Sequence, residues 1–569
     1  MSSNSSLNVA VLGGGITGLA SAYYLSKWLP SAHITLYESS PRLGGWIRSQ
    51  RVPVKGGHVL FEAGPRTLRP SMNGSLAMSL TQELGLAEDG IYVQKNSTGA
   101  CSRYLYYPDH LVRMPHGALG MRAIFQDLGK EPVLRKLMWS ALTEFSRKPR
   151  PPGVEDESVG EFFSRRLGKD AVDRVLSAVI HGIYAGDPWQ LSAKSLFPMP
   201  WRHEVESGSI SSGMLSNHLS SQEAISKVDG EFLQQMKDYP WDPRLEATIK
   251  QTAIFTYKDG LAMLVERLAE HLSQNPSVEI KTSTPVESIS PDPMQSGITV
   301  KTNGQDAPQL YGHVISSLSP ANLNLVDRPS PEWRPLIAPI PSVTVMTVNL
   351  YFRSPNLHPP GFGYLIPTGV PVENNPENAL GVVFDSAYSP SPDDVLLEDP
   401  GQTKEVQPAK TKNFVWYNPR RPGFQDDQSQ PGTKVTVMLG GHLWDKLSAY
   451  PDEKDGLDLA RRVLKRQLGI TEEPEAYMVN LQKDCIPQYT VGHEKRLRDA
   501  HDNVWREYDN SLRVAGNWIK GVGVNDCLRT AWDVASSLAR GKEGTGLEHV
   551  GTREFVALQH NVREVSREN

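Results

Sequence analysis

Long apolar runs, paired cysteines and an excess of charge are all missing from this chain of 569 residues. No run of about 18 apolar residues occurs, so the sequence predicts no transmembrane helix. Its three cysteines, Cys101, Cys485 and Cys527, show no C-x-x-C spacing, which argues against a disulfide framework, an iron–sulfur cluster or a zinc site. A net charge of −5 gives no reason to expect nucleic acid. The Ser-rich, uncharged residues 1–8 are too short for a transit peptide, so no cleavable presequence is expected.

A glycine-rich turn near the N-terminus is the strongest functional motif. An apolar run precedes it and a helical pattern follows it, so the G-x-G-x-x-G spacing stands in a strand–turn–helix context. Such a turn brings backbone amides and a helix N-terminus to a pyrophosphate. Glu38 ends the next apolar run, about 20 residues after the turn, where a carboxylate binds an adenosine ribose. The expected dinucleotide-binding residues are Gly13, Gly14, Gly15, Ile16, Thr17, Gly18 and Glu38.

Three further elements point to a flavin. Glycines beside arginine recur at 42–48 and 64–67, where they let backbone approach phosphate. Far along the chain, a strand-like run leads through glycines into a helix near residue 524. The amides of such a helix start stabilise negative charge on a reduced flavin, whose ring lies far from its adenine. We therefore predict FAD, bound in addition by Arg42, Trp46, Gly64, Pro65, Arg66, Thr67, Val286, Asn517, Val522, Gly523 and Val524.

The order of helical and strand-like segments predicts an α/β protein with a discontinuous domain plan. A Rossmann-like FAD-binding domain is expected from residues 7–90, 255–323 and 485–541. A mostly helical domain that binds substrate or membrane is expected at 91–254, and a strand-rich, mixed α+β substrate-binding segment at 324–484. Within the latter, residues 386–432 are rich in Pro, Asp, Gln and Lys and are expected to form a mobile loop.

These motifs together resemble the superfamily of FAD-dependent amine oxidases and desaturases. Within it the chain resembles the protoporphyrinogen oxidase family, at residues 42–49, 64–66, 435–441, 485–490 and 521–527. Trp46 stands where the amine oxidase branch commonly has a second arginine. The resemblance implies oxidation of protoporphyrinogen IX to protoporphyrin IX in haem biosynthesis, through FAD, with O2 as acceptor and hydrogen peroxide as product. The open alternatives are another flavin-dependent amine oxidase, a carotenoid desaturase, or a non-catalytic tetrapyrrole-binding flavoprotein.

The resemblance also assigns substrate-binding residues. Arg103 matches an arginine that pairs with a propionate, which suits a guanidinium, and Gly182 matches a glycine whose carbonyl faces the pyrrole N–H groups. His181 stands where some members have arginine, and we interpret it as structural. No Ser-His-Asp, paired-carboxylate or metal arrangement stands out, so no catalytic side chain is assigned and the flavin is expected to carry the chemistry. The residues expected to sandwich the tetrapyrrole are Phe362, Leu365 and Met438.

An apolar helical face at residues 134–145 has two interpretations. It is formed by Leu134, Leu137, Met138, Ala141, Leu142 and Phe145, with basic residues at 135, 136, 147, 148 and 150. It is either a core helix of the substrate domain or a monotopic attachment to an anionic membrane surface. The family resemblance implies a peripheral position on the mitochondrial inner membrane. The sequence leaves open a homodimer and a hand-over of product to ferrochelatase.

Overall fold

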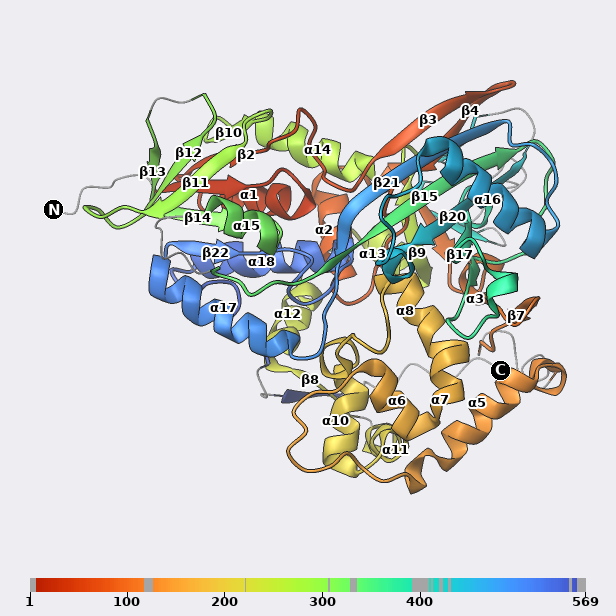
Figure 1. Ribbon diagram of the computed structural model, residues 1–569. Helices are drawn as coiled ribbons and strands as arrows, with labels where there is room; N and C mark the ends of the chain where they lie inside the picture. Colours follow the sequence, from red (N-terminus) through yellow and green to blue (C-terminus); the bar gives the residue numbers. More distant parts are fainter. Residues whose placement is uncertain are drawn as a thin grey trace.

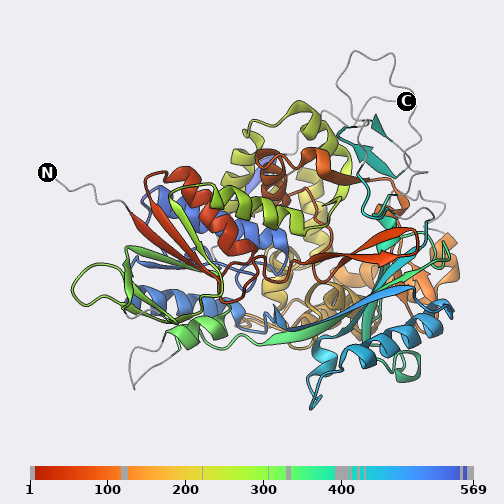
Figure 2. The same ribbon diagram turned by 90° about the horizontal axis from the view of Figure 1, so that it is seen from above.

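The chain forms two sheet domains and a group of helices (Figure 1). The computed structural model describes residues 7–116, 126–220, 222–304, 307–327, 335–390, 409–410, 413–418, 423–427, 431–551 and 555–559. Seen from above, the five-stranded parallel sheet and the seven-stranded mixed sheet lie toward opposite ends of the molecule (Figure 2). The chain passes between these parts several times, so each is assembled from separate segments.

A five-stranded parallel sheet brings the three predicted FAD-domain segments together. Its order is β10-β2-β1-β14-β22, with β1 (Asn8–Leu12), β2 (His33–Tyr37), β10 (Val278–Lys281), β14 (His313–Ser316) and β22 (Leu512–Val514). Residues of β1 alternate between two apolar cores because both faces of the sheet are covered. One face packs against α1 (Ile16–Trp28), α2 (Gly74–Glu83), α14 (Ala262–Ser273) and α18 (Val524–Ala539), and the other against α15 (Pro320–Val326) and α17 (His493–Tyr508).

Two antiparallel units border this sheet. A three-stranded unit, β11 (Val286–Pro291), β12 (Ile298–Thr302) and β13 (Gln309–Tyr311), connects β10 to β14. A hairpin, β3 (Ser49–Val54) and β4 (Gly57–Glu62), leads from the nucleotide domain to the second large sheet. Thr347 in that sheet donates to the Ala63 carbonyl at 2.8 Å, so the hairpin end is fixed to it.

A seven-stranded sheet forms the strand-rich part, in the order β21-β15-β20-β17-β16-β6-β7. It contains β15 (Ser342–Phe352), β16 (Gly363–Leu365), β17 (Ala379–Phe384), β20 (Thr433–Gly440) and β21 (Ala476–Pro487), and α16 (Glu453–Leu468) packs on one face. Its last two strands, β6 (Tyr104–Tyr106) and β7 (Leu111–Arg113), come from the segment expected to be mostly helical. These strands are an exception within that segment, because β6 pairs with β16 and buries Leu105 and Tyr106.

A four-stranded sheet, β18-β19-β5-β9, includes part of the expected mobile loop. Most of residues 386–432 lie outside the described ranges. Within them, β19 (Phe414–Trp416) pairs with β5 (Gly90–Gln94), which also pairs with β9 (Thr252–Tyr257), while β18 (Ala409–Lys410) lies at the edge. The three residues of β19 are buried, so this stretch is not the surface segment that its polar flanks suggested.

The remaining helices occupy the centre, the right and the lower right of Figure 1. They are α3 (Thr98–Cys101), α5 (Pro132–Thr143), α6 (Val159–Leu167), α7 (Lys169–Ala171), α8 (Ser177–Tyr184), α9 (Ala193–Leu196), α10 (Pro198–Ser207), α11 (Ile210–Ser220), α12 (Lys227–Lys237) and α13 (Pro243–Gln251). A small sheet of β8 (Gln222–Ser226) and β23 (Phe555–Gln559) accompanies them. Among the described residues, no helix has the length and apolar character needed to cross a membrane.

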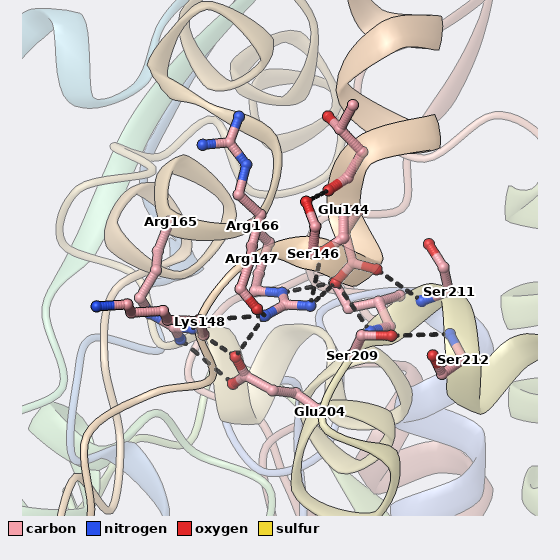
Figure 3. A network of polar contacts seen from close by, with 12 residues as sticks. Glu144, Ser146, Arg147, Lys148, Arg165, Arg166, Glu204, Ser209, Ser211 and Ser212 are labelled. Atoms are coloured by element: carbon pink, nitrogen blue, oxygen red, sulfur yellow. Dashed lines mark hydrogen bonds and ion pairs between the residues drawn. The ribbon is translucent and has the colours of Figure 1, made fainter.

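A buried ionic network fixes the end of α5 to α6, α10 and α11 (Figure 3). Arg166 is fully buried and donates from Nε to Glu144 Oε1 at 2.6 Å. The Glu144 carboxylate also accepts from the amides of Ile210 and Ser211, each at 2.9 Å, at the start of α11. Glu204 lies 3.5 Å from Arg166. Buried charges are tolerated only when paired and hydrogen-bonded in this way, so the network holds the chain just after α5 firmly against the helical core.

Candidate flavin and substrate site

The first glycine turn has the geometry that a dinucleotide requires. Gly13 has φ +99°, a conformation that residues with a side chain rarely adopt. A Cβ on Gly18 would lie 1.9 Å from the Gly13 carbonyl oxygen, so α1 packs this closely on β1 only because Gly18 lacks one. Gly15, in contrast, has nothing within 4 Å of where a Cβ would be. The turn is therefore closed toward the protein and open beside Gly15, where a ligand can approach the start of α1.

The second glycine element packs against the first. The Gly44 amide donates to the Gly14 carbonyl at 2.8 Å, which joins the two turns. Arg42 donates to the carbonyls of Leu43 and Ile47, each at 2.9 Å, so its guanidinium shapes the loop around Gly44. Its contact with a phosphate stays a prediction. Together the two turns form one continuous backbone surface next to the N-terminus of α1.

Glu38 lies at the edge of this surface. Its carboxylate accepts from the amides of Gly14 at 2.7 Å and Ser40 at 2.8 Å. The Glu38 carbonyl accepts from the Thr284 amide at 2.8 Å, which brings the start of β11 and Val286 to the same edge. Oε1 also accepts from Ser39 Oγ at 3.3 Å, but Oε2 keeps a second lone pair, so Glu38 can still accept a hydrogen bond from a ribose hydroxyl.

The Gly64–Thr67 element contacts the loop that carries Trp46. A Cβ on Gly64 would lie 2.4 Å from the Trp46 carbonyl oxygen, so this close approach needs glycine. Arg66 is buried and its Nη1 atom lies 3.0 Å from Asp385 Oδ1. Pro65 and Thr67 on either side are half-buried. Arg66 thus links the nucleotide domain to the end of β17.

The C-terminal glycine run leads to a second helix N-terminus beside the first. Gly523 caps α18, and the amides of Val524 and Asn525 in its first turn have no acceptor inside the helix. The Thr17 side chain of α1 lies beside the Cys527 thiol of α18, so the two helix starts are neighbours. Burial raises the pKa of Cys527 to about 12, which keeps the thiol protonated.

Tyr489 fixes the turn before α18 through two hydrogen bonds of its hydroxyl group. Its hydroxyl donates to the Asn517 carbonyl at 2.5 Å and accepts from the Gly521 amide at 3.0 Å. Val522, between Gly521 and the helix cap, is half-buried. Two adjacent helix N-termini, an open Gly15 and a carboxylate at the far edge fit a long dianionic cofactor such as FAD.

The predicted substrate residues Leu365 and Met438 meet on one face of the seven-stranded sheet. Leu365 of β16 pairs with Gly381 of β17, and Gly381 pairs with Met438 of β20. Residues directly paired across strands point to the same face, so no side chain stands between Leu365 and Met438. Thr347, which pairs with Met438, bonds the Ala63 carbonyl, so this face is directed toward the nucleotide domain.

Arg103 and Phe362 lie together where the neighbouring strands β6 and β16 begin. The Arg103 guanidinium carbon is 5.9 Å from the centre of the Phe362 ring, and the Phe362 amide donates to the Ser102 carbonyl at 2.9 Å. Partial burial, and after it the neighbouring Arg69, lowers the pKa of Arg103. Neither arginine forms an ion pair with a carboxylate of the described residues, so this end of the sheet attracts anions.

Helix α8 covers Leu365. A Cβ on Gly182 would lie 2.7 Å from Leu365 Cδ1, so helix and side chain touch only because residue 182 is glycine. The preceding His181 is 4% exposed. Its Nδ1 atom lies 2.6 Å from the Ile366 carbonyl oxygen and its Nε2 atom 2.8 Å from His442 Nε2. Because protein atoms contact both of its ring nitrogens, His181 has the surroundings of a structural residue.

The cofactor and substrate elements are contiguous. Asn517 donates to the Cys485 carbonyl at 3.3 Å, and Cys485 shares an apolar cluster with Ala185 and Met438. At the end of α8, the Tyr184 ring centre is 5.8 Å from that of Tyr489. The glycine turn before α18 and the substrate face are therefore parts of one site.

Sequence reasoning missed three residues of this site, which are Gly381, Asp385 and His442. The glycine within the apolar run 379–384 was a usable signal, because glycine inside a strand often marks a close approach. Asp385 and His442 had none, since each acquires its role from a partner far away in the sequence.

Comparison with known proteins identifies the family. The chain matches the flavin containing amine oxidoreductases over residues 16–539 and belongs to that family, which makes it a flavin-dependent oxidoreductase. It is 34% identical over 543 residues to the protoporphyrinogen oxidase of Schizosaccharomyces pombe, covering 94% of this chain and 99% of that protein. Identity to the protoporphyrinogen oxidase of Homo sapiens is 31% over 537 residues, covering 93% and 98%.

A solved structure shows the same fold. The crystal structure of a protein from an Exiguobacterium species superposes with a TM-score of 0.66 at 21% identity, covering 95% of this chain and 100% of that one. These matches confirm the family resemblance and the α/β flavoprotein fold expected from the sequence. The individual site residues stay predictions, now with the positions given above.

Proposed function

We propose that this chain oxidises protoporphyrinogen IX to protoporphyrin IX, with O2 as the final acceptor and hydrogen peroxide as the product. The observation that carries the proposal is the near full-length similarity to proteins of that activity. FAD held by the glycine turns would supply the capacity to accept two electrons at a time, which the side chains of the site lack. The protein contributes binding, orientation and exclusion of water.

The residues of the site suit a large apolar substrate that carries carboxylates. Leu365 and Met438 offer apolar surface on one sheet face, with only Gly381 paired between them. Phe362 adds an aromatic ring, and Arg103 beside it is available to a propionate. The Gly182 carbonyl belongs to the helix that closes over Leu365. This combination of broad apolar contact with a few polar groups is typical of a small-molecule site.

One experiment distinguishes the proposed activity from the alternative functions. The purified protein, with its flavin absorbance measured, is mixed with protoporphyrinogen IX, and porphyrin fluorescence and peroxide are followed; spermine and a carotenoid precursor are run in parallel. We expect fluorescence and peroxide with the porphyrinogen only. Turnover of spermine or the carotenoid precursor instead would assign another branch of the family. Tight porphyrin binding without turnover would make the protein a tetrapyrrole carrier.

We further propose that the end of α5 and the turn just after it attach the protein to a membrane surface. Val133 and Leu134 are buried, but Trp139, Leu142 and Phe145 are 65%, 56% and 66% exposed. Arg135, Lys136, Arg147 and Lys148 around them are exposed as well. An exposed apolar surface surrounded by basic groups favours shallow insertion among anionic lipids. The mitochondrial inner membrane, a homodimer and a hand-over to ferrochelatase remain predictions.

A further inference from the structure

Two histidines join the three segments that carry predicted substrate residues. His181 precedes Gly182 on α8, and its Nδ1 atom lies 2.6 Å from the carbonyl oxygen of Ile366, which follows Leu365. Its Nε2 atom lies 2.8 Å from Nε2 of His442, in the turn that follows β20 and Met438. His181 is thus adjacent to Gly182 in the sequence, and Ile366, to which it is bonded, is adjacent to Leu365. His442 connects both segments to the end of β20.

The hydrogen bonds define where the protons are. A carbonyl oxygen only accepts, so His181 carries its hydrogen on Nδ1. In neutral His181 the Nε2 atom is then an acceptor, and His442 must donate from its own Nε2. Burial lowers the pKa of His181 to about 4 and lowers that of His442 as well. Both rings are neutral at physiological pH.

The charged groups that face the pair do not alter this assignment. Asp187 acts to raise the pKa of both histidines and Asp445 that of His442, but burial outweighs them in each case. His181 cannot accept a substrate proton on Nε2 without losing its bond from His442. It cannot release the Nδ1 proton without losing the bond to Ile366. The two histidines are therefore arranged to hold their positions and not to transfer a proton.

Further contacts fix α8 on the same two sides. The His442 amide donates to the Ala185 carbonyl at the end of α8 at 2.8 Å, and a Cβ on Gly441 would lie 2.2 Å from that carbonyl oxygen. On the other side, the Thr368 amide donates to Ser177 Oγ at 3.0 Å. The imidazole pair connects these two contact regions through the middle of the helix.

We propose that His181 and His442 are positioning residues that set the distance between α8 and the face carrying Leu365 and Met438, and so determine how tightly the porphyrinogen binds. The inference rests on the proposed function. Without the bond between the two histidines, Gly182 can move relative to Leu365. Small displacements of groups that position a substrate weaken its productive binding. A buried hydrogen bond contributes about 1 kcal/mol, which corresponds to a change of roughly fivefold in binding.

The decisive comparison is between His442→Leu, which removes the donor, and His442→Gln, whose amide nitrogen can donate from the position of Nε2. We expect His442→Leu to raise the KM for protoporphyrinogen IX about fivefold, with kcat and its pH profile unchanged within a factor of about two. His442→Gln is expected to keep the wild-type KM within the same factor. His442→Asn, polar but too short to reach His181, should behave like His442→Leu and replaces it if that variant does not fold.

Two results would contradict the positioning role. The positioning role is wrong if the KM values of both His442→Leu and His442→Asn stay within a factor of about two of wild type. A fall in kcat of about 100-fold or more, with loss of the acid limb of the pH profile, would instead mark a proton acceptor. Wild-type turnover separates this inference from the proposed function: an inactive wild type overturns both, whereas an active wild type with unaffected variants overturns only the pair.

Discussion

Leu365 and Met438 stand on one face of the seven-stranded sheet with only Gly381 between them, paired in register with both. This relationship places two residues that are far apart in the sequence on either side of one glycine. The Leu365 side chain lies over this glycine, because a Cβ on residue 381 would be 3.0 Å from Leu365 Cδ2. The size of residue 381 should therefore control where the Leu365 side chain lies, and with it how well a flat macrocycle is bound.

Gly381→Ala tests that control. A Cβ there would lie 2.5 Å from the Tyr364 carbonyl oxygen and 3.0 Å from Leu365 Cδ2, so neighbouring strands or Leu365 must shift. Overpacking of this kind costs about 1–3 kcal/mol. We expect KM for protoporphyrinogen IX to rise about tenfold, measured by porphyrin fluorescence. Gly312→Ala, whose Cβ meets nothing closer than 3.6 Å, is the matched control. Equal KM values in both variants would contradict the assignment.

Asp385 should be needed for flavin retention because it fixes Arg66. The two side chains are 6% and 9% exposed and lie 3.0 Å apart. Asp385→Ala leaves a buried arginine without its partner, which typically costs about 3–5 kcal/mol. We expect a lower thermal midpoint and less flavin per chain after gel filtration. Asp499→Ala, which breaks the exposed pair with Lys495, should change neither. Full flavin content and an unchanged midpoint in Asp385→Ala would refute the role.

Glu62 should make stability depend on pH. It accepts from Ser49 Oγ at 2.7 Å and the Leu261 amide at 2.8 Å, and burial raises its pKa from 4.5 to about 8. The folded chain then holds a proton that the unfolded chain releases, so the contribution is full below about pH 4.5 and is lost as pH rises toward 8. The maximum slope is about 1.4 kcal/mol per pH unit.

Glu62→Gln mimics the protonated carboxyl and removes this slope. The thermal midpoint of the variant, relative to wild type, should therefore increase steadily between about pH 5 and pH 8. Glu473→Gln, at an exposed carboxylate, provides the control for a change of charge alone. A midpoint difference that stays constant over this range would show that Glu62 is ionised in the folded protein.

The sequence predicted the nucleotide half better than the substrate half, and the reason is physical. The Gly13–Gly18 turn, its strand and its helix are local, so their spacing alone specifies them. The contact of His181 with His442 spans 261 positions, and the row through Gly381 depends on strand register, which a sequence pattern does not determine. The strand at 414–416 was missed because polar neighbours concealed three buried residues.

The exposed end of α5 should govern membrane attachment. A triple change of Trp139, Leu142 and Phe145 to serine removes three apolar side chains that are more than half exposed, so little folded-state packing is lost. Burying each such side chain in an apolar phase is worth about 1.5–3 kcal/mol at most. We expect flotation with anionic liposomes to fall about 100-fold, with turnover of detergent-dispersed porphyrinogen retained. A serine substitution at Met294, 88% exposed and outside α5, should leave flotation unchanged. Equal flotation of the triple variant and wild type would show that lipid contacts another surface or none.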